Sequence, residues 1–313
     1  MENKIIDLLN KKNLSKNSIV MYIRQLRILN DNKEITNLDF LKDKKKVMED
    51  IKNKKPNTQR NYLISICSVL KSLVDDENNV QLKKLYDYYF DELMKLSKEL
   101  KEEQEKNEKS ETQKENWIEF KDVQNVLKDM MEEVKDYNKK TITKQQYDKL
   151  LKTMILSLYV LVPPRRNKDY QKMEILKTKK IPKEQKNYLS LPLNQFIFRD
   201  YKTAKTEMKK NKDGVVVDIP EELRNIINLY LSVRQKPSPY FLVSYDGEPL
   251  ESVNAITSIL NKIFGKKISS SILRHSFLTH HYGKDLDKLK EMKNISEKMS
   301  HSTAMQQEYI KKD

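Results

Sequence analysis

The apolar positions of the first hundred residues recur every three or four residues, which is the spacing of one helix face. Ser15 precedes the first clear stripe and is expected to cap its helix, whereas Pro56 interrupts the pattern before a later helix that Asn57 or Thr58 would cap. The stripes consist of Ile19, Tyr22, Ile23, Leu26 and Leu29, then a segment from Leu41 to Ile51, then Tyr62, Ile66, Val69, Leu70 and Leu73, and finally Leu82, Leu85, Tyr89, Leu93, Leu96 and Leu100. This pattern predicts a helical bundle over residues 1–100.

The apolar pattern stops after Leu100 and returns at Trp117. Residues 101–116 read KEEQEKNEKSETQKEN and contain no apolar residue, so we expect a charged linker there. Tyr147 to Val162 is a strongly apolar stretch that predicts a helix ending before two prolines. Residues 187–219 are rich in β-branched and aromatic residues and contain an Asp-Gly turn, which predicts a small antiparallel sheet. The expected fold is therefore mostly α with a small antiparallel β-sheet, the second domain spanning residues 117–313.

Basic residues exceed acidic ones, and their distribution along the chain is uneven. The chain of 313 residues has 61 Lys and Arg against 46 Asp and Glu, a formal net charge of +15. Residues 1–74 carry 16 basic and 8 acidic groups, residues 75–116 carry 8 and 13, and residues 117–313 carry 37 and 25. Two basic blocks on either side of an acidic one fit a two-part clamp on a polyanion, and double-stranded DNA is the first candidate partner.

Exposed cations of the predicted bundle are candidate contacts to a DNA backbone. They are Lys11, Lys12, Lys16, Arg24, Arg27, Lys54, Lys55 and Arg60.

The single cysteine, Cys67, excludes an intramolecular disulfide and a cysteine-based zinc site, and its apolar neighbours predict a core position. No apolar run approaches the ~20 residues of a membrane span, and the first residues do not resemble a signal peptide. We therefore expect an intracellular, reducing location without membrane association, and the sequence leaves nucleus and cytoplasm open.

Three residues near the end of the sequence have side chains suited to phosphate chemistry. Arg274 lies in a helical pattern, His301 in a Ser-His-Ser turn, and Tyr309 in the last residues. An arginine fork can hold a phosphate, a histidine can hydrogen-bond it, and a tyrosine oxygen can attack it. Cutting a phosphodiester without metal or cofactor requires such a set together with an acid for the leaving oxygen.

The motifs PPRRNKDY, YKTAKT, LRHSFLTHH and MSHSTAMQQEYIKK, taken in this order, resemble the tyrosine recombinase (phage integrase) family. The sequences of these motifs are most similar to those of integrase-like proteins of giant DNA viruses, virophages and related mobile elements. The resemblance covers nearly the whole chain. It implies a SAM-like helical core-binding domain and an α+β catalytic domain that cleaves DNA, with dimers or tetramers assembling on it and with no cofactor or metal.

The resemblance assigns roles to residues of the second domain. The first family arginine precedes an acidic residue by three positions, which favours Arg166, supported by Asp169, over Arg165. The family's hairpin lysine, a general acid, is Lys202 or Lys205, and the sequence leaves both open.

The same resemblance makes Arg274 the second arginine, His301 a phosphate donor and Tyr309 the nucleophile. The family places a histidine three residues before the second arginine, whereas this chain has Ser271. Ser271 is therefore either a donor to phosphate or one of three serines at a helix start.

The function implied by the resemblance is site-specific DNA recombination or integration through a 3′-phosphotyrosyl intermediate. Two alternatives stay open. A type IB topoisomerase would share the chemistry but relax supercoils as a monomer. A recombinase-derived protein without catalysis would bind duplex DNA only, and the serine at position 271 keeps this reading open.

Overall fold

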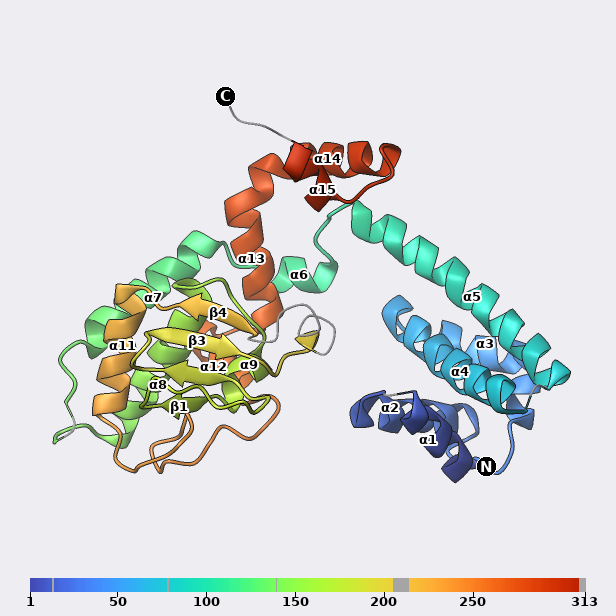
Figure 1. Ribbon diagram of the computed structural model, residues 1–313, viewed down its shortest axis with the longest axis horizontal. Coiled ribbons are helices and arrows are strands. Elements are labelled where there is room, and N and C mark those ends of the chain that lie inside the picture. The colour runs from blue at the N-terminus through green and yellow to red at the C-terminus, as the bar shows by residue number, and fades with distance from the viewer. Residues whose placement is uncertain (13, 78, 139, 205–213, 310–313) are drawn as a thin grey trace. The chain divides into compact units, whose positions relative to one another are not determined.

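The computed structural model describes residues 1–12, 14–77, 79–138, 140–204 and 214–309. The chain divides into two compact units, Met1–Glu108 and Lys109–Asp313, here called unit 1 and unit 2 (Figure 1). The segment expected as a linker, residues 101–116, is helical over most of its length, because it holds the last turn of one helix and a short second helix.

Unit 1 is helical throughout its described elements (Figure 1). In chain order these are α1 (Glu2–Lys11), α2 (Lys16–Leu29), the 3-10 helix η1 (Asp39–Lys42), α3 (Lys44–Lys52), α4 (Pro56–Glu77) and α5 (Val80–Glu105). The apolar stripes seen in the sequence are the faces that these helices bury, and α4 lies at the centre, in contact with α1, α2, α3 and α5. The predicted bundle is therefore present.

Local signals explain where two of these helices begin. Ser15 caps α2, and its side-chain oxygen accepts a hydrogen bond from the backbone N–H of Ser18 at 3.1 Å. The expected cap at Asn57 or Thr58 is wrong, because α4 already begins at Pro56. Proline suits the first helical position, where its missing N–H would have no partner within the helix. Cys67 is buried in the core as expected, and burial raises the pKa of its thiol to about 12.

Unit 2 combines helices with a small sheet (Figure 1). Its helical elements are α6 (Glu111–Asn116), α7 (Phe120–Val134), α8 (Lys144–Val160), α9 (Asn167–Gln171), α11 (Glu221–Ser232), α12 (Ala255–Phe264), α13 (Ser270–Tyr282), η2 (Gly283–Asp285), α14 (Leu286–Lys298) and α15 (Thr303–Tyr309). Helix α8 is central, since α7, α11, α12 and α13 all contact it. Its apolar residues are buried on all sides, which matches their nearly continuous run in the sequence.

The described strands form one sheet in the order β1 (Glu174–Leu176), β2 (Tyr188–Ser190), β3 (Gln195–Phe198) and β4 (Val215–Asp218). The pairs β2/β3 and β3/β4 are antiparallel, but β1 and β2 are parallel. The expectation of an antiparallel sheet is therefore wrong for one edge. The extra strand β1 is three residues long and follows α9 closely, so it leaves little periodicity to recognise in the sequence. The coarser prediction, mostly α with a small sheet, is confirmed.

The sheet packs on α9 through aromatic rings. The ring of Tyr170 lies 5.8 Å from that of Phe196 and 5.6 Å from that of Phe198, both edge to face. All three side chains are fully buried. This contact fixes α9, and the residues just before it, against the end of β3. Within the described residues, no helix combines the length and apolar character needed to cross a membrane.

Candidate phosphate site

A cavity of about 220 Å³ opens in unit 2 beside the start of α9, the end of β3 and one face of α13. We call it the arginine cavity. Its lining residues are Pro164, Arg165, Arg166, Asp169, Tyr201, Thr203, Val215 and Arg274. Three guanidinium groups against one carboxylate give this small space an excess of positive charge. Guanidiniums are the side chains best suited to hold phosphate or carboxylate in two-point contact.

Arg165 is held in place on two sides. Its Nε donates a hydrogen bond to Oδ2 of Asp169 at 3.0 Å. Its guanidinium carbon also lies 3.9 Å from the centre of the Phe198 ring, a cation–π contact. Strand β3, which carries Phe198, therefore supports Arg165, and the carboxylate of Asp169 neutralises much of the charge of this arginine.

Arg166 and Arg274 are the cations that Asp169 neutralises less. Arg166 is the residue that precedes α9, with extended backbone, and its carbonyl accepts the Asp169 N–H at 2.9 Å. Arg274 lies one turn into α13, where its Nε donates to the carbonyl of Ser270 at 3.3 Å. Burial lowers the pKa of Arg274, and the nearby charge of Arg166 lowers it further. Two repelling cations at a partly buried position favour an anion between them.

Asp169 itself is almost fully buried. Burial raises the pKa of its carboxyl group, although Arg165 and, less strongly, Arg166 oppose this. We expected the carboxylate to support Arg166, three positions earlier. The side-chain hydrogen bond goes instead to Arg165, four positions earlier, because Arg166 binds Asp169 through backbone atoms. The spacing in the sequence did not distinguish a side-chain pair from a backbone turn.

Lys202 lies in a turn after β3 and is exposed. Its two neighbours, Tyr201 and Thr203, line the arginine cavity, whereas Lys202 is not one of the residues that do so in the described part of unit 2. The other candidate for the lysine role, Lys205, falls outside the described residues. Lys202 is therefore adjacent in sequence to two residues of the cavity lining. The choice between Lys202 and Lys205 stays open.

Ser271 is exposed in the first turn of α13 and is not part of the cavity lining. The serine that caps the helix is Ser269, whose side-chain oxygen accepts a hydrogen bond from the Ile272 N–H at 3.4 Å. The capping role considered for Ser271 therefore belongs to its neighbour two positions earlier.

The side chains of His301 and Tyr309 lie together, one in the turn before α15 and the other at the end of this helix. Their ring centres are 5.7 Å apart. His301 stands in the turn between α14 and α15, its backbone N–H bonded to the carbonyl of Ser296 at 3.1 Å. Its Nε2 atom is buried and has no hydrogen-bond partner among the described residues. Tyr309 is 64% exposed at the end of α15.

These two residues are absent from the described lining of the arginine cavity. Helix α15 packs on α14, and both follow the C-terminal end of α13, whereas Arg274 lies near its N-terminal end (Figure 1). The structure thus brings together Arg166, Asp169 and Arg274 as one group and His301 and Tyr309 as another. It does not join the two groups.

Four of the eight candidate DNA-contacting residues of unit 1 have a partner within the protein. Lys12 pairs with Asp75, Arg27 with Glu2, Arg60 donates to Ser97, and Lys54 lies over the ring of Tyr62. The remaining candidates are exposed and form no ion pair within the described part of the chain. They are Lys11, Lys16, Arg24 and Lys55.

The sequence favours Arg166 over Arg165, and it gives no signal for Tyr201 and Thr203 as cavity residues. The clue for Arg165 was its position four residues before Asp169, the spacing of an ion pair across one turn. Nothing local indicated that the segment after β3 would line the cavity. No group of His, Cys, Asp and Glu within the described residues could hold a metal ion.

Comparison of the chain with known protein families, with curated proteins and with solved structures finds no match.

Proposed function

We propose that the protein is a site-specific DNA strand-exchange enzyme of the tyrosine recombinase type. In this proposal unit 1 grips duplex DNA as the core-binding domain, unit 2 carries the chemistry, and copies of the chain assemble on the DNA. The observation that carries it is the meeting of Arg166 and Arg274 in one cavity although they are more than a hundred residues apart in the sequence. Both arginines stand in motifs that resemble those of the family.

The chemistry follows from the residue types. The Tyr309 hydroxyl releases its proton to solvent as its oxygen attacks the scissile phosphorus, the bond between phosphorus and the 5′ oxygen breaks, and a 3′-phosphotyrosyl ester forms. The released 5′ oxygen takes a proton from Lys202 or Lys205. Arg166, Arg274 and His301 stabilise the charge on the phosphate, with Ser271 as a further donor if it approaches. The reverse attack by another 5′-hydroxyl joins a new strand.

The separation of the two groups sets a requirement for this mechanism. Tyr309 and His301 do not line the arginine cavity in the described structure, so α15 has to approach the cavity when DNA is bound. The ring of Tyr309 is largely exposed, and Nε2 of His301 has no hydrogen-bond partner among the described residues, so both groups retain the capacity for a contact to DNA.

The test is trapping of the covalent intermediate. The full chain is incubated with a library of random-sequence duplexes that carry one nick, from which a short 5′-hydroxyl fragment can diffuse away after cleavage. We expect protein–DNA adducts that survive denaturation, form equally with and without EDTA, and map by mass spectrometry to Tyr309. Sequencing the trapped DNA would reveal the preferred site.

Tyr309→Phe should abolish the adduct. Tyr282→Phe is the matched control, since Tyr282 is likewise an exposed tyrosine of unit 2 and should retain it. An adduct on another residue, or an equal yield from Tyr309→Phe, would refute the assigned nucleophile.

The absence of Tyr309 from the described cavity lining also favours a second candidate, a DNA-binding protein that does not cut. Such a protein would bind duplex DNA with a steep salt dependence, and Tyr309→Phe would leave this binding unchanged. Binding without any adduct in the trapping experiment would support this candidate over the enzyme.

A further inference from the structure

Asn187 connects two segments of unit 2 that border the arginine cavity. It is the residue before β2, and it is 6% exposed. Its Nδ2 donates hydrogen bonds to the carbonyl oxygens of Asp169 at 2.9 Å and of Asp200 at 2.7 Å. Its Oδ1 accepts hydrogen bonds from the backbone N–H groups of Arg199 and Asp200, both at 2.8 Å. One side-chain amide thus uses both of its donors and both acceptor positions within the protein.

The two connected segments supply different parts of the cavity lining. Asp169 lines the cavity, and its N–H donates to the carbonyl of Arg166 at 2.9 Å. Residues 199–200 follow β3 and lead directly to Tyr201 and Thr203, which also line the cavity. The amide therefore links the arginine side of the cavity to the turn after β3.

That turn carries one candidate for the proton donor and leads to the other. Lys202 lies between two residues of the cavity lining, and Lys205 follows shortly after in the sequence. The N–H of Ala204 donates to the carbonyl of Tyr201 at 2.9 Å, and Ala204 is 1% exposed. The turn is thus anchored at its start by the Asn187 amide and at its end by a buried alanine.

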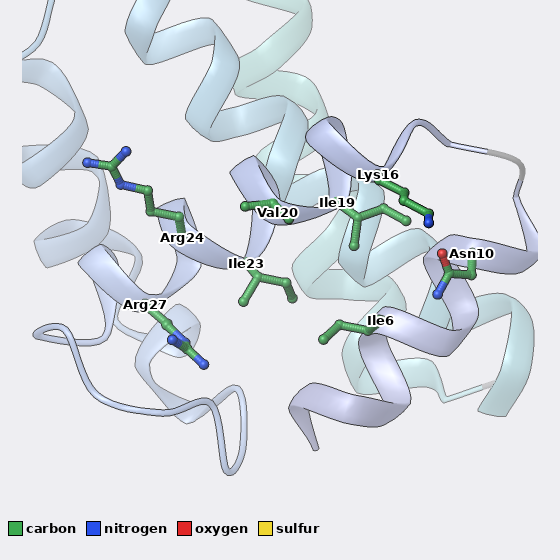
Figure 2. A pocket seen from close by; sticks show the side chains of 8 residues that line it. All are labelled: Ile6, Asn10, Lys16, Ile19, Val20, Ile23, Arg24 and Arg27. Carbon is green, nitrogen blue, oxygen red and sulfur yellow. The ribbon is translucent and has the colours of Figure 1, made fainter. Parts of the chain in front are cut away.

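An asparagine at a cavity does not always form such a bridge. Unit 1 has an open groove of about 480 Å³ between α1 and α2, where Figure 2 shows Ile6 opposite Ile19 and Ile23. Asn10 also lines this groove (Figure 2), but it is exposed and its side chain forms no hydrogen bond within the described part of the chain. The four hydrogen bonds of Asn187 therefore follow from its position in the fold.

Removal of the amide would leave backbone groups near the cavity without their partners. Each unsatisfied buried group costs about 1–3 kcal/mol, so the turn after β3 is expected to shift until water reaches these groups. A displacement of about 1 Å can lower a rate about a hundredfold when the displaced group takes part in the reaction. The position of the turn thus matters most for a residue on it that transfers a proton.

We propose that Asn187 is a positioning residue for proton transfer to the leaving oxygen. Its amide fixes residues 199–204, which include Lys202 and lead to Lys205, relative to Arg166. This inference rests on the proposed function and adds a residue that belongs neither to the sequence motifs nor to the described cavity lining. In this role Asn187 acts through the turn and does not touch the phosphate.

The test compares two leaving groups with the full chain. At the site recovered by adduct trapping, nicked duplexes carry either the natural bridging 5′ oxygen or a sulfur atom in its place. The oxygen needs a proton to leave, whereas sulfur leaves readily as a thiolate without one. The rate of adduct formation is measured with both duplexes for each variant. The ratio of the two rates does not depend on how much of the protein is folded.

Asn187→Ala should raise the ratio of the sulfur rate to the oxygen rate at least about tenfold, because only the oxygen duplex needs the positioned acid. Lys202→Ala and Lys205→Ala are the reference variants. The one that removes the acid should change the ratio in the same direction, which would also identify the lysine.

Two asparagines provide controls. Asn194 precedes β3, and its Nδ2 donates to the carbonyl of Ile219 at 2.8 Å. Asn194→Ala removes an amide–carbonyl bond at the other end of this strand and should leave the ratio unchanged, even if it destabilises the protein. Asn10→Ala should also leave the ratio unchanged, because this side chain lies in unit 1 and is exposed.

An unchanged ratio in Asn187→Ala, even with both rates reduced, would show that the amide only stabilises the fold and would overturn the proposal. An equal change of the ratio in Asn194→Ala would overturn it as well. Both results leave the proposed function intact, because adducts still form. If the original protein forms no adduct with either duplex, the proposed function fails, and the role of Asn187 fails with it.

Discussion

Nε of Arg165 donates a hydrogen bond to Oδ2 of Asp169 at 3.0 Å, and the same guanidinium lies over the Phe198 ring. Arg166, the next residue, has no side-chain hydrogen bond or ion pair within the described residues and lines the same cavity. Two adjacent arginines thus have different surroundings. One is a positioning residue held by the protein, and the other is available to a ligand.

This difference predicts separable effects of substitution. Arg165→Ala should lower the free energy of unfolding by about 2 kcal/mol, because it removes a cation–π contact and leaves a buried carboxylate without its partner. Arg166→Ala should change it by less than about 0.5 kcal/mol but abolish covalent adduct formation. Urea denaturation and adduct trapping measure the two effects. Equal destabilisation by both substitutions would contradict the assignment.

The raised pKa of Asp169 predicts a pH dependence of stability. The folded protein keeps a proton on this buried carboxyl at pH values where the unfolded chain has released it. The resulting contribution to stability is full below the unfolded pKa and is lost as pH rises through the folded pKa. The window opens near the ordinary value of 3.8 and extends upward.

Asp169→Asn removes this titration. The free energy of unfolding of the original protein relative to Asp169→Asn should therefore fall as pH rises through the window. Thermal unfolding of both proteins over a pH series measures the difference. A difference that grows with pH would show that the ion pair with Arg165 outweighs burial.

The repulsion between Arg166 and Arg274 predicts anion binding in the absence of DNA. Inorganic sulfate should stabilise the protein by about 1.4 kcal/mol when its concentration is ten times its dissociation constant. Arg274→Ala should remove this gain, whereas Arg224→Ala, at an exposed position on α11, should keep it. Differential scanning fluorimetry with sodium chloride at matched ionic strength separates binding from general salt effects. An equal response of all three proteins would exclude a specific site.

Ser269 and Ser271, at the start of α13, are predicted to respond differently to substitution by alanine. Ser269→Ala should cost about 1 kcal/mol of stability, since it removes the cap of the helix that carries Arg274. Ser271→Ala should leave stability unchanged, because that side chain is exposed and is not the cap. If Ser271 assists at the phosphate, the same substitution lowers the rate of adduct formation. A stability loss confined to Ser271→Ala would reverse the assignment.

If unit 1 binds DNA as proposed, its exposed cations set the salt dependence of that binding. Replacing Lys11 and Lys55 together with glutamine should reduce the slope of log affinity against log salt concentration by about 2, because each phosphate contact contributes about 0.9. Fluorescence anisotropy with a labelled duplex measures this slope. Lys46, which pairs with Asp31, provides a control substitution. An unchanged slope in the double variant would place DNA on another face.

Much of the fold could be predicted from the sequence, since the relevant signals are local. The stripe from Ile19 to Leu29 and the cap at Ser15 correspond to α2, and the apolar run before Pro163 corresponds to α8. Strand β1 could not be predicted, because three residues give no usable period and its parallel partner β2 lies a dozen residues further on. Pairing between such short strands is decided by packing rather than by propensity.

The sequence by itself determined which residue types are available for phosphate chemistry, and the order of Arg166, Arg274, His301 and Tyr309 in the chain. Only the tertiary structure decided which of them share a space. In the structure Arg166 and Arg274 line one cavity, and Asp169 accepts a hydrogen bond from Arg165. His301 and Tyr309 lie together outside the described cavity lining. The physical reason is that spacing along a chain sets contacts only within a turn or two of helix. Contacts over longer separations depend on which buried faces pack together.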